Sequence, residues 1–521
     1  MTELLKNYVN GQWVAGNRPG TVLRDPVTGT ELVRVSRAGL DVDGAFRFAR
    51  DTGGKALRAM TYGERAATLG EIVKVLQSNR DAYYEIATAN SGTTKNDSAV
   101  DIDGAIFTLG QYAKWGAALG DTRALLDGAR VKFGKASTFN SQHVMVPTRG
   151  IALFINAFNF PSWGLWEKAA PALLSAVPVI VKPATATAWL TQRMVADVIA
   201  AGILPPGALS IICGNSAGLL DALKPFDVLS FTGSAETAVK IRSHPAMIER
   251  SVRVNIEADS LNSALLLPDA TADSEAMALL VREVVREMTI KAGQKCTAIR
   301  RILVPEVLYD AAAQTIDAKL KGITVGNPRN ESVRMGSLVS REQYQAVVEG
   351  IAALSTQARL LHDGGQHKLV DADPAIAACV GPTLFGARNA DAAETVHRME
   401  VFGPVATLLP YKNIDHALAL IRRGEGSLVA SLYGTDPAML AHAATELADS
   451  HGRVHVISPA VAATHTGHGN VMPHSLHGGP GRAGGGEELG GLRALNFYHR
   501  RAAIQADAAV LDSLAALPFS Y

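Results

Sequence analysis

Three segments of the chain carry side chains that could work together in covalent catalysis. Cys296 follows a glycine and a lysine and precedes two arginines within residues 293–301. A thiol attacks a carbonyl carbon as the thiolate, and nearby positive charge lowers its pKa, so this segment predicts an activated nucleophile. Asn159, just before a Phe-Pro pair, offers an amide, and Glu257 closes a strand-like run. A thiol, an amide donor and a carboxylate are the groups needed to oxidise an aldehyde through a thioester.

For Cys296 taken by itself, the alternative is a buried structural cysteine. The three cysteines, Cys213, Cys296 and Cys379, are odd in number and spread widely, which argues against a disulfide framework and favours a reducing cytoplasm. The sequence shows no Cys/His spacing typical of a zinc site, so we expect no metal.

Size and composition indicate a globular protein with more than one domain. A chain of 521 residues exceeds what one hydrophobic core usually supports. The net charge of +1 gives no sign of a nucleic-acid surface. The N-terminus lacks the apolar segment of a signal peptide, and the longest apolar run, 171–181, is about half a membrane span. We therefore expect a cytoplasmic protein without a nucleic-acid or membrane partner.

Apolar patterns place the candidate residues on an α/β framework. Residues 8–14 alternate around Asn-Gly, which predicts a hairpin, and residues 40–120 have helical periodicity. Two exposed strands are expected within 127–149. Apolar strands then alternate with helical stretches over 150–257 and again over 258–463, as in parallel sheets covered by helices on both faces.

The C-terminal part predicts a loop followed by a strand. Residues 464–491 are rich in Gly and His and are expected to cross between domains. Within them, residues 479–484 satisfy G-x-G-x-x-G, but no strand precedes and no helix follows, so we do not expect a dinucleotide-binding loop there. Residues 495–498 predict a closing strand.

In order along the chain, these segments resemble the aldehyde dehydrogenase superfamily. The motifs that carry the resemblance span almost the whole sequence: Phe158-Asn159-Phe160-Pro161, Lys182-Pro183-Ala184, Phe231-Thr232-Gly233-Ser234, Glu257, Gly293-Gln294-Lys295-Cys296, Gly381-Pro382-Thr383-Leu384-Phe385 and Glu400-Val401-Phe402-Gly403-Pro404-Val405.

The resemblance implies an α/β, aldehyde dehydrogenase-like fold with three parts. A Rossmann-type NADP-binding domain would comprise residues 1–126 and 150–257, and an α/β catalytic domain residues 258–463. A small β oligomerisation flap would comprise residues 127–149 and 492–521, with 464–491 as the Gly-rich crossing loop.

Two segments depart from the common family pattern. Residues 257–262 read Glu-Ala-Asp-Ser-Leu-Asn, and Cys-Thr-Ala-Ile-Arg-Arg follows the lysine at 295. Both variants resemble the branch that acts on CoA-bound semialdehydes in benzoate degradation, and the aldehyde dehydrogenase part of phenylacetate ring-opening enzymes. The latter carry a further C-terminal hydratase domain, and this sequence ends at Tyr521. We therefore expect the stand-alone type, with an acyl-CoA semialdehyde as substrate.

The resemblance assigns roles to the three catalytic candidates. Cys296 would attack the aldehyde to form a thiohemiacetal, and then a thioester. Asn159 and the backbone N–H of Cys296 would stabilise the oxyanion. Glu257 would activate the water that hydrolyses the thioester, a task that suits a carboxylate whose pKa is raised by burial.

The resemblance also implies the cofactor residues. Lys182 would bind the adenosine ribose, and Thr185 stands where many NAD-preferring members carry Glu. Because Thr185 would not repel a 2′-phosphate, we expect NADP, with weaker use of NAD. The remaining contacts would come from Gly214 near the adenine, Gly233 and Ser234 at the pyrophosphate, and Glu400 and Phe402 at the nicotinamide ribose.

Further polar residues are weaker candidates. Glu488 could relay protons or could equally be a plain surface glutamate. Glu167 is a weaker candidate for the same role, and its default interpretation is a charge on a helix surface. Lys168 and the aromatic residues Phe158, Trp163 and Trp166 could line the aldehyde tunnel or belong to the core.

Other functions remain open at the level of sequence. One is a general medium-chain aliphatic aldehyde dehydrogenase. A CoA-acylating enzyme is disfavoured by Glu257, and a non-catalytic binding or structural member is disfavoured by the presence of both Cys296 and Glu257. A homodimer or homotetramer is expected.

Overall fold

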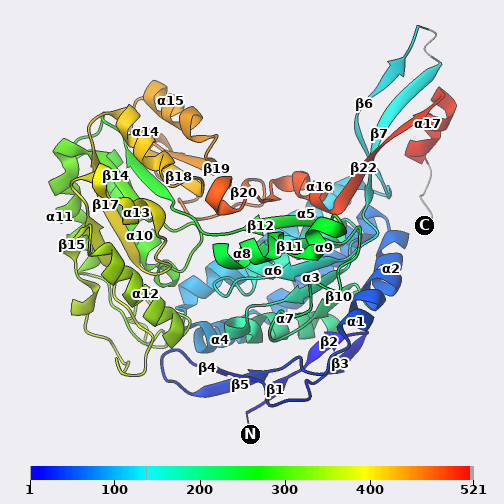
Figure 1. Cartoon of the computed structure of the whole chain (residues 1–521), viewed down its shortest axis with the longest axis horizontal. Coiled ribbons are helices and arrows are strands. Elements are labelled where there is room, and N and C mark those ends of the chain that lie inside the picture. Colours follow the sequence, from blue (N-terminus) through cyan, green and yellow to red (C-terminus); the bar gives the residue numbers. More distant parts are fainter. Residues whose placement is uncertain (1, 136–137, 517–521) are drawn as a thin grey trace.

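A computed structural model describes residues 2–135 and 138–516, and shows two α/β units joined side by side with an arm projecting from one of them (Figure 1). The first unit is built on a seven-stranded sheet. The strand order is β12 (Arg253–Glu257), β11 (Val228–Thr232), β8 (Ala152–Ile155), β9 (Val179–Lys182), β10 (Leu209–Ile211), β2 (Asn7–Val9) and β3 (Gln12–Val14). The first five strands are parallel, and the hairpin β2–β3 adds an antiparallel edge. Its turn residues Asn10 and Gly11 have φ of 55° and 72°, so the predicted Asn-Gly hairpin is confirmed.

Helices cover both faces of this sheet because its central strands are apolar on both sides. Successive side chains of β8 point to opposite faces of the sheet: Leu153 belongs to the core cluster on one face and Phe154 to the cluster on the other. The Phe154 face is covered by α3 (Tyr62–Ser78), α4 (Arg80–Ser91), α5 (Lys95–Leu119), α6 (Trp163–Leu174) and α7 (Ala188–Ala200). The opposite face is covered by α1 (Val42–Phe48), α8 (Ala235–Arg242) and α9 (Pro245–Glu249).

The second unit repeats this design with another seven-stranded sheet. Its order is β15 (Arg359–His362), β16 (Thr383–Gly386), β17 (Val405–Tyr411), β14 (Arg301–Pro305), β13 (Ser263–Leu266), β18 (Ser427–Tyr433) and β19 (His451–Ile457). Only β15 runs antiparallel to its neighbour. One face is covered by α10 (Glu275–Thr289) and α11 (Tyr309–Leu320), and the other by α12 (Arg341–Leu354), α13 (Glu394–Arg398), α14 (Ile414–Arg422) and α15 (Pro437–Leu447). The predicted fold class is confirmed.

The N-terminal segment that leads into the first unit also contacts the second unit. A small sheet of β1 (Leu4–Leu5), β5 (Glu31–Val35) and β4 (Thr21–Arg24) lies near the N-terminus. After β4, Val27 is buried in the core of the second unit, and Asp25 pairs with Arg329 at 2.5 Å. The domain boundaries inferred from sequence did not anticipate this contact.

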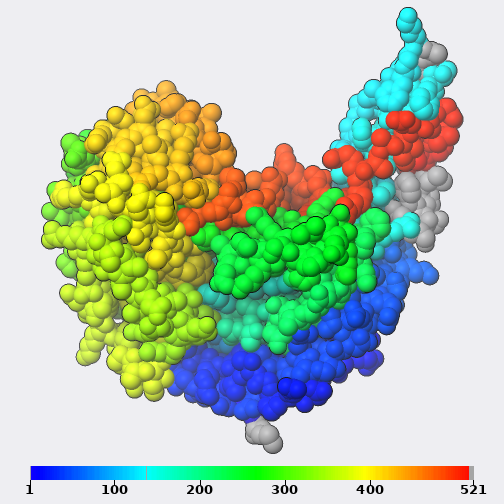
Figure 2. Space-filling view, in the orientation of Figure 1, coloured from blue at the N-terminus to red at the C-terminus, as the bar shows by residue number. Residues whose placement is uncertain are grey.

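The arm is a three-stranded antiparallel sheet of β6 (Leu125–Phe133), β7 (Phe139–Pro147) and β22 (His499–Ala506), followed by α17 (Ala508–Ala516). It stands clear of the body in the space-filling view (Figure 2). Two strands lie within the expected range 127–149, of which residues 136–137 are outside the described residues. β6 is largely exposed, whereas β7, which pairs on both sides, is mostly buried.

The predicted strand at residues 495–498 is wrong. Leu495–Tyr498 form a short helix, α16, and the strand begins at His499. An apolar run of four residues does not distinguish helix from strand. Here Leu495 and Tyr498 lie three residues apart on one helical face and are both buried, and the Tyr498 hydroxyl donates to the carbonyl of Lys168.

The Gly-rich segment crosses between the two units, as expected. It contains the short strands β20 (Leu476–Gly478) and β21 (Glu487–Leu489), which pair with each other. β20 packs on β19 of the second unit, and β21 packs on α6 of the first (Figure 1). The G-x-G-x-x-G stretch lies between these strands, where a Cβ at Gly479 or Gly484 would collide with backbone. It is therefore a close-packed turn. Within the described residues, no helix is long and apolar enough to cross a membrane.

Candidate active site

The segment that carries Cys296 has an unusual backbone. After α10, Lys291, Ala292 and Gly293 have φ of 52°, 51° and 67° in succession. A Cβ at Gly293 would lie 2.2 Å from the carbonyl oxygen of Gly403, so this position requires glycine. The turn holds Cys296 partly exposed at the junction of the two units.

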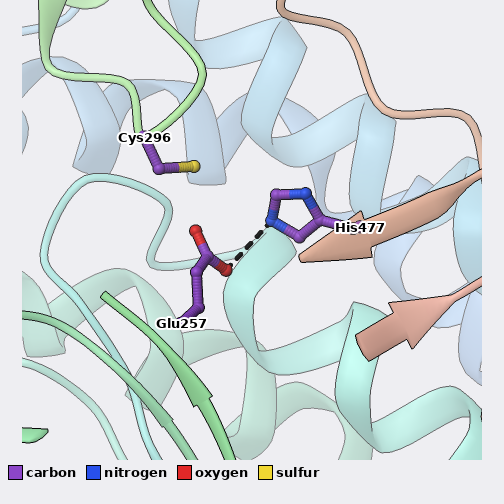
Figure 3. A group of neighbouring side chains, drawn as sticks. All are labelled: Glu257, Cys296 and His477. Carbon is purple, nitrogen blue, oxygen red and sulfur yellow. Dashed lines mark ion pairs between the residues drawn. The ribbon is translucent and has the colours of Figure 1, made fainter. Parts of the chain in front are cut away.

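Glu257 faces Cys296 from the end of β12. Parallel strands present their carboxyl ends at one edge of a sheet, and this edge points toward the junction. Oxygen of Glu257, sulfur of Cys296 and nitrogen of His477 all lie within 4.8 Å of one another (Figure 3). Glu257 Oε2 pairs with His477 Nε2 at 3.0 Å, and both side chains are buried.

The expected activation of Cys296 by nearby positive charge is wrong. Lys295 is committed to a buried ion pair with Glu287 at 2.9 Å, and Arg300 binds Glu400 and backbone carbonyls. Burial raises the pKa of Cys296 well above its ordinary value, and the charge of Glu257 raises it further. The thiol is thus protonated at rest and needs a base.

Asn159 lies beside the Cys296 turn. Its Nδ2 donates to the carbonyl oxygen of Gln294 at 3.0 Å, and its side chain is 8% exposed. The structure therefore brings together the thiol, the carboxylate and the amide that the sequence singled out from three distant segments.

A buried charge network continues behind Glu257. Lys168 Nζ lies 2.5 Å from Glu167 Oε1 and 3.0 Å from Glu488 Oε2. Glu488 also accepts hydrogen bonds from Ser230 and Asn255. Neither glutamate is a solvated surface residue, and burial raises the pKa of Glu167 to about 8.

A largely apolar cavity of about 220 Å³ opens onto Cys296. Trp163, Phe160, Phe107, Val471 and Met472 contribute to its wall. Of the aromatic residues expected there, Trp163 lines the cavity. Trp166 is fully buried in the core, and Phe158 packs edge-to-face on Phe402 with ring centroids 5.7 Å apart.

Comparison with known proteins identifies the family. The sequence pattern of the aldehyde dehydrogenase family matches residues 13–504. The chain belongs to this family. It is 56% identical, over 477 residues, to a 3,4-dehydroadipyl-CoA semialdehyde dehydrogenase of Aromatoleum evansii, covering 91% of this chain and 93% of that protein.

Solved structures show the same fold. An NADP-dependent enzyme of E. coli matches with a TM-score of 0.82 at 22% identity, over 97% of this chain and 98% of that chain. The betaine aldehyde dehydrogenase of Staphylococcus aureus in complex with NAD⁺ also matches with a TM-score of 0.82 at 22% identity, over 96% and 95% of the two chains. The non-catalytic alternative is thereby set aside: the protein is an aldehyde dehydrogenase, of a family that uses NAD or NADP.

In this aldehyde dehydrogenase, several expected dinucleotide residues line one cavity. Lys182 is the last residue of β9, as expected, and Thr185 and Gly214 border a cavity of about 730 Å³. Gly214 has φ of +137°, a conformation that favours glycine. The Thr185 hydroxyl donates to the carbonyl of Gly214 at 3.2 Å.

Two arginines that sequence analysis missed line the same cavity. Arg37 and Arg18 come from the N-terminal segment, far from Lys182 in sequence. Arg37 donates to the side chain of Asn215 and to the carbonyl of Ala217, both of which are neutral. Burial lowers the pKa of Lys182, and the charge of Arg37 lowers it further.

The other cofactor candidates flank the site. Ser234 is exposed and caps α8, with Gly233 directly before it, so the helix N-terminus faces solvent where an anion can approach. Glu400 accepts from the backbone N–H of Ser260 at 3.1 Å, and Phe402 packs beneath Arg300. Glu400 and Phe402 therefore lie on the Cys296 side of the junction, and Thr185 and Gly214 lie at the separate cavity of about 730 Å³.

His477 is the other residue that sequence analysis missed. It lies in the Gly- and His-rich segment, where the composition indicated a loop and gave no sign of a contact with Glu257. Its position opposite Glu257 depends on the pairing of β20 with β21.

Proposed function

We propose that this aldehyde dehydrogenase oxidises 3,4-dehydroadipyl-CoA semialdehyde to the free carboxylic acid, with NADP as hydride acceptor, in CoA-dependent benzoate degradation. The substrate is inferred from the 56% identity to the Aromatoleum evansii enzyme over nearly the full length of both chains. The site supports hydrolytic chemistry because it sets a buried carboxylate, Glu257, beside the thiol of Cys296.

The side chains divide the reaction into two halves. Cys296 attacks the aldehyde carbon, and the oxyanion that forms takes hydrogen bonds from Asn159 and the backbone N–H of Cys296. A nicotinamide held near Glu400 and Phe402 would supply the hydride acceptor. Glu257 then takes a proton from the water that attacks the thioester, and Lys168 and Glu488 pass that proton toward solvent.

Steady-state rates test the substrate. We expect kcat/KM for the CoA semialdehyde to exceed that for hexanal by about 10²-fold or more, because the CoA moiety adds binding energy remote from the reacting carbon. Mass spectrometry of the product should show a free carboxylate. A new CoA thioester formed from added CoA would instead indicate an acylating enzyme.

A general medium-chain aliphatic aldehyde dehydrogenase is the second candidate. The apolar cavity at Cys296, walled by Phe107, Val471 and Met472, favours it because those side chains suit an unbranched alkyl chain. Equal kcat/KM for hexanal and the CoA semialdehyde would support this candidate.

We propose that NADP is preferred over NAD because of the cationic cavity at Thr185. Arg37 and Lys182 offer two positive charges for a 2′-phosphate, and Thr185 adds no negative charge. Arg37 would grip the phosphate through charge-assisted hydrogen bonds.

Replacing Arg37 with alanine tests this preference. We expect the Kd for NADP to rise about 10- to 100-fold, because one or two charge-assisted hydrogen bonds to the 2′-phosphate would be lost. The Kd for NAD should change less than about threefold. Fluorescence titration with both dinucleotides measures this, with the exposed Arg47→Ala as control. An equal rise in Kd for NADP and NAD would show that Arg37 does not contact the 2′-phosphate.

We further propose that the arm assembles the enzyme into a homodimer or homotetramer. Leu126, Val131, Phe133 and Phe139 are 41–52% exposed on this projecting sheet. Exposed apolar side chains gathered on one element are typical of a protein interface.

The double variant Phe133→Ser/Phe139→Ser should be monomeric. Removing two exposed aromatic rings takes away the largest apolar contacts the arm can offer. Light scattering after size exclusion measures the mass. The control is Val307→Ser, which removes a side chain 89% exposed on the second unit and should leave the assembly unchanged. An unchanged oligomer in the double variant would contradict assembly through these rings.

A further inference from the structure

His477 occupies a position that the two-step chemistry does not explain. Its Nε2 faces Glu257 Oε2 at 3.0 Å (Figure 3). Its ring packs edge-to-face on Trp163 with centroids 5.2 Å apart. Glu257 Oε1 is buried without a hydrogen-bond partner among the described residues and points toward Cys296. The carboxylate therefore lies between the thiol and the imidazole, with one oxygen toward each.

Charged groups face His477 from each neighbouring element. Glu257 comes from β12, Glu488 from the paired strand β21, and Glu167 with Lys168 from α6. Burial raises the pKa of Glu167 to about 8, and the adjacent Lys168 opposes that rise.

Glu257 by itself is a weak base in this setting. Burial would raise its pKa, but the charges of His477 and Lys168 outweigh burial and lower the pKa to about 2. A base works best when its pKa is near the working pH. Burial would also lower the pKa of His477, but Glu257 and the other carboxylates outweigh it and raise the pKa above 6.5. The two groups interact strongly enough to titrate as a pair.

We infer that Glu257 and His477 act as one shared base, in which Glu257 collects the proton from the thiol or the water and His477 holds it. This inference rests on the proposed hydrolytic function and makes His477 a positioning residue that acts through Glu257.

The proton balance of each half-reaction is closed. In the first, the S–H bond of Cys296 breaks, an S–C bond forms to the aldehyde carbon, and the proton ends on Nε2 of His477. His477 then releases this proton toward solvent by way of Glu488 and Lys168 and is neutral again before the second half begins. In the second half, an O–H bond of water breaks and a C–O bond forms, the C–S bond breaks with its electron pair leaving on sulfur, and the proton of water passes through Glu257 to the neutral His477. No oxidant enters either proton transfer.

The alkylation of Cys296 by iodoacetamide tests the inference without aldehyde or dinucleotide. The rate of labelling of the Cys296 peptide, followed by mass spectrometry across pH, reports the thiolate. In the wild-type enzyme we expect two rising limbs: one where His477 loses its proton, so that the neutral imidazole can receive the thiol proton by way of Glu257, and a second one at more alkaline pH. A single alkaline limb in the wild type would overturn the inference, whatever the variants do.

His477→Gln should lose the first limb. Labelling at pH 7.5 should fall about tenfold, the effect of a shift of one pH unit, because the uncompensated Glu257 beside the thiol favours the protonated form. His474→Gln is the control, since His474 lies three residues away, is exposed and packs on Trp115. Should His477→Gln not fold, His477→Asn and the wild-type profile take its place.

A double-mutant cycle separates action through Glu257 from a structural role. In a Glu257→Gln background, His477→Gln should change the rate at pH 7.5 less than about twofold, because the proton acceptor is already gone. The same tenfold loss in both backgrounds would overturn the inference. A wrong substrate assignment would appear differently, as absent turnover with the two-limb profile intact.

Discussion

Cys296→Ala should abolish aldehyde oxidation while dinucleotide binding persists. In the proposed mechanism the sulfur bonds to the aldehyde carbon, so its removal takes away both the thiohemiacetal and the thioester. Loss of a nucleophile that acts in concert with its base costs roughly 10⁴-fold or more in kcat. The measurement is NADPH formation from the CoA semialdehyde and from hexanal, alongside NADP titration.

Cys379→Ala is the matched control. Cys379 is buried in the core of the second unit, where its sulfur lies 3.8 Å from the carbonyl oxygen of Gly326, and it borders neither active-site cavity. Its replacement should leave kcat within about twofold, as expected of a residue outside the site. Substantial NADPH formation by the Cys296 variant would mean that a different group forms the covalent adduct.

Glu257→Gln should separate the two halves of the reaction. Because the charge of Glu257 raises the pKa of Cys296, its removal lowers that pKa, and a first burst of NADPH should persist. The thioester should then accumulate, since no base activates water, and kcat should fall about 10²- to 10⁴-fold. Rapid-mixing measurement of the burst and intact-mass detection of the acyl-enzyme test both halves.

Glu249→Gln is the control for the loss of a glutamate. Glu249 is exposed at the end of α9, and its replacement should preserve kcat. A Glu257 variant that shows no acyl-enzyme yet turns over at the wild-type rate would rule out Glu257 as the deacylating base.

The fold was predictable because its signals are local. Apolar strands separated by helical stretches specified both sheets, and Asn10-Gly11 specified the edge hairpin. Lys182 and Glu257 fall at strand ends, as their apolar flanks predicted. The strand prediction for residues 495–498 failed because so short an apolar run fits the periodicity of a helix as well as that of a strand. Packing against α6 favours the helix.

The electrostatics of the site were not predictable, because they depend on partners distant in sequence. Lys295 appeared to be an activating charge, but Glu287 on the preceding helix neutralises it. Arg37 lies 145 residues before Lys182, and His477 lies 220 residues after Glu257, so no spacing links either pair. The sequence indicated the candidate reacting groups. The charged residues that shift the pKa values of these groups could be identified only in the folded chain.

The late position of β20 and β21 affects synthesis of the enzyme. When the ribosome has translated the chain through residue 470, Cys296, Glu257 and Asn159 already exist, but His477 and Glu488 do not. The thiol of Cys296 is therefore synthesised before His477 and Glu488, which complete its surroundings in the folded enzyme. Chains that end before residue 477 would carry the nucleophile without these partners.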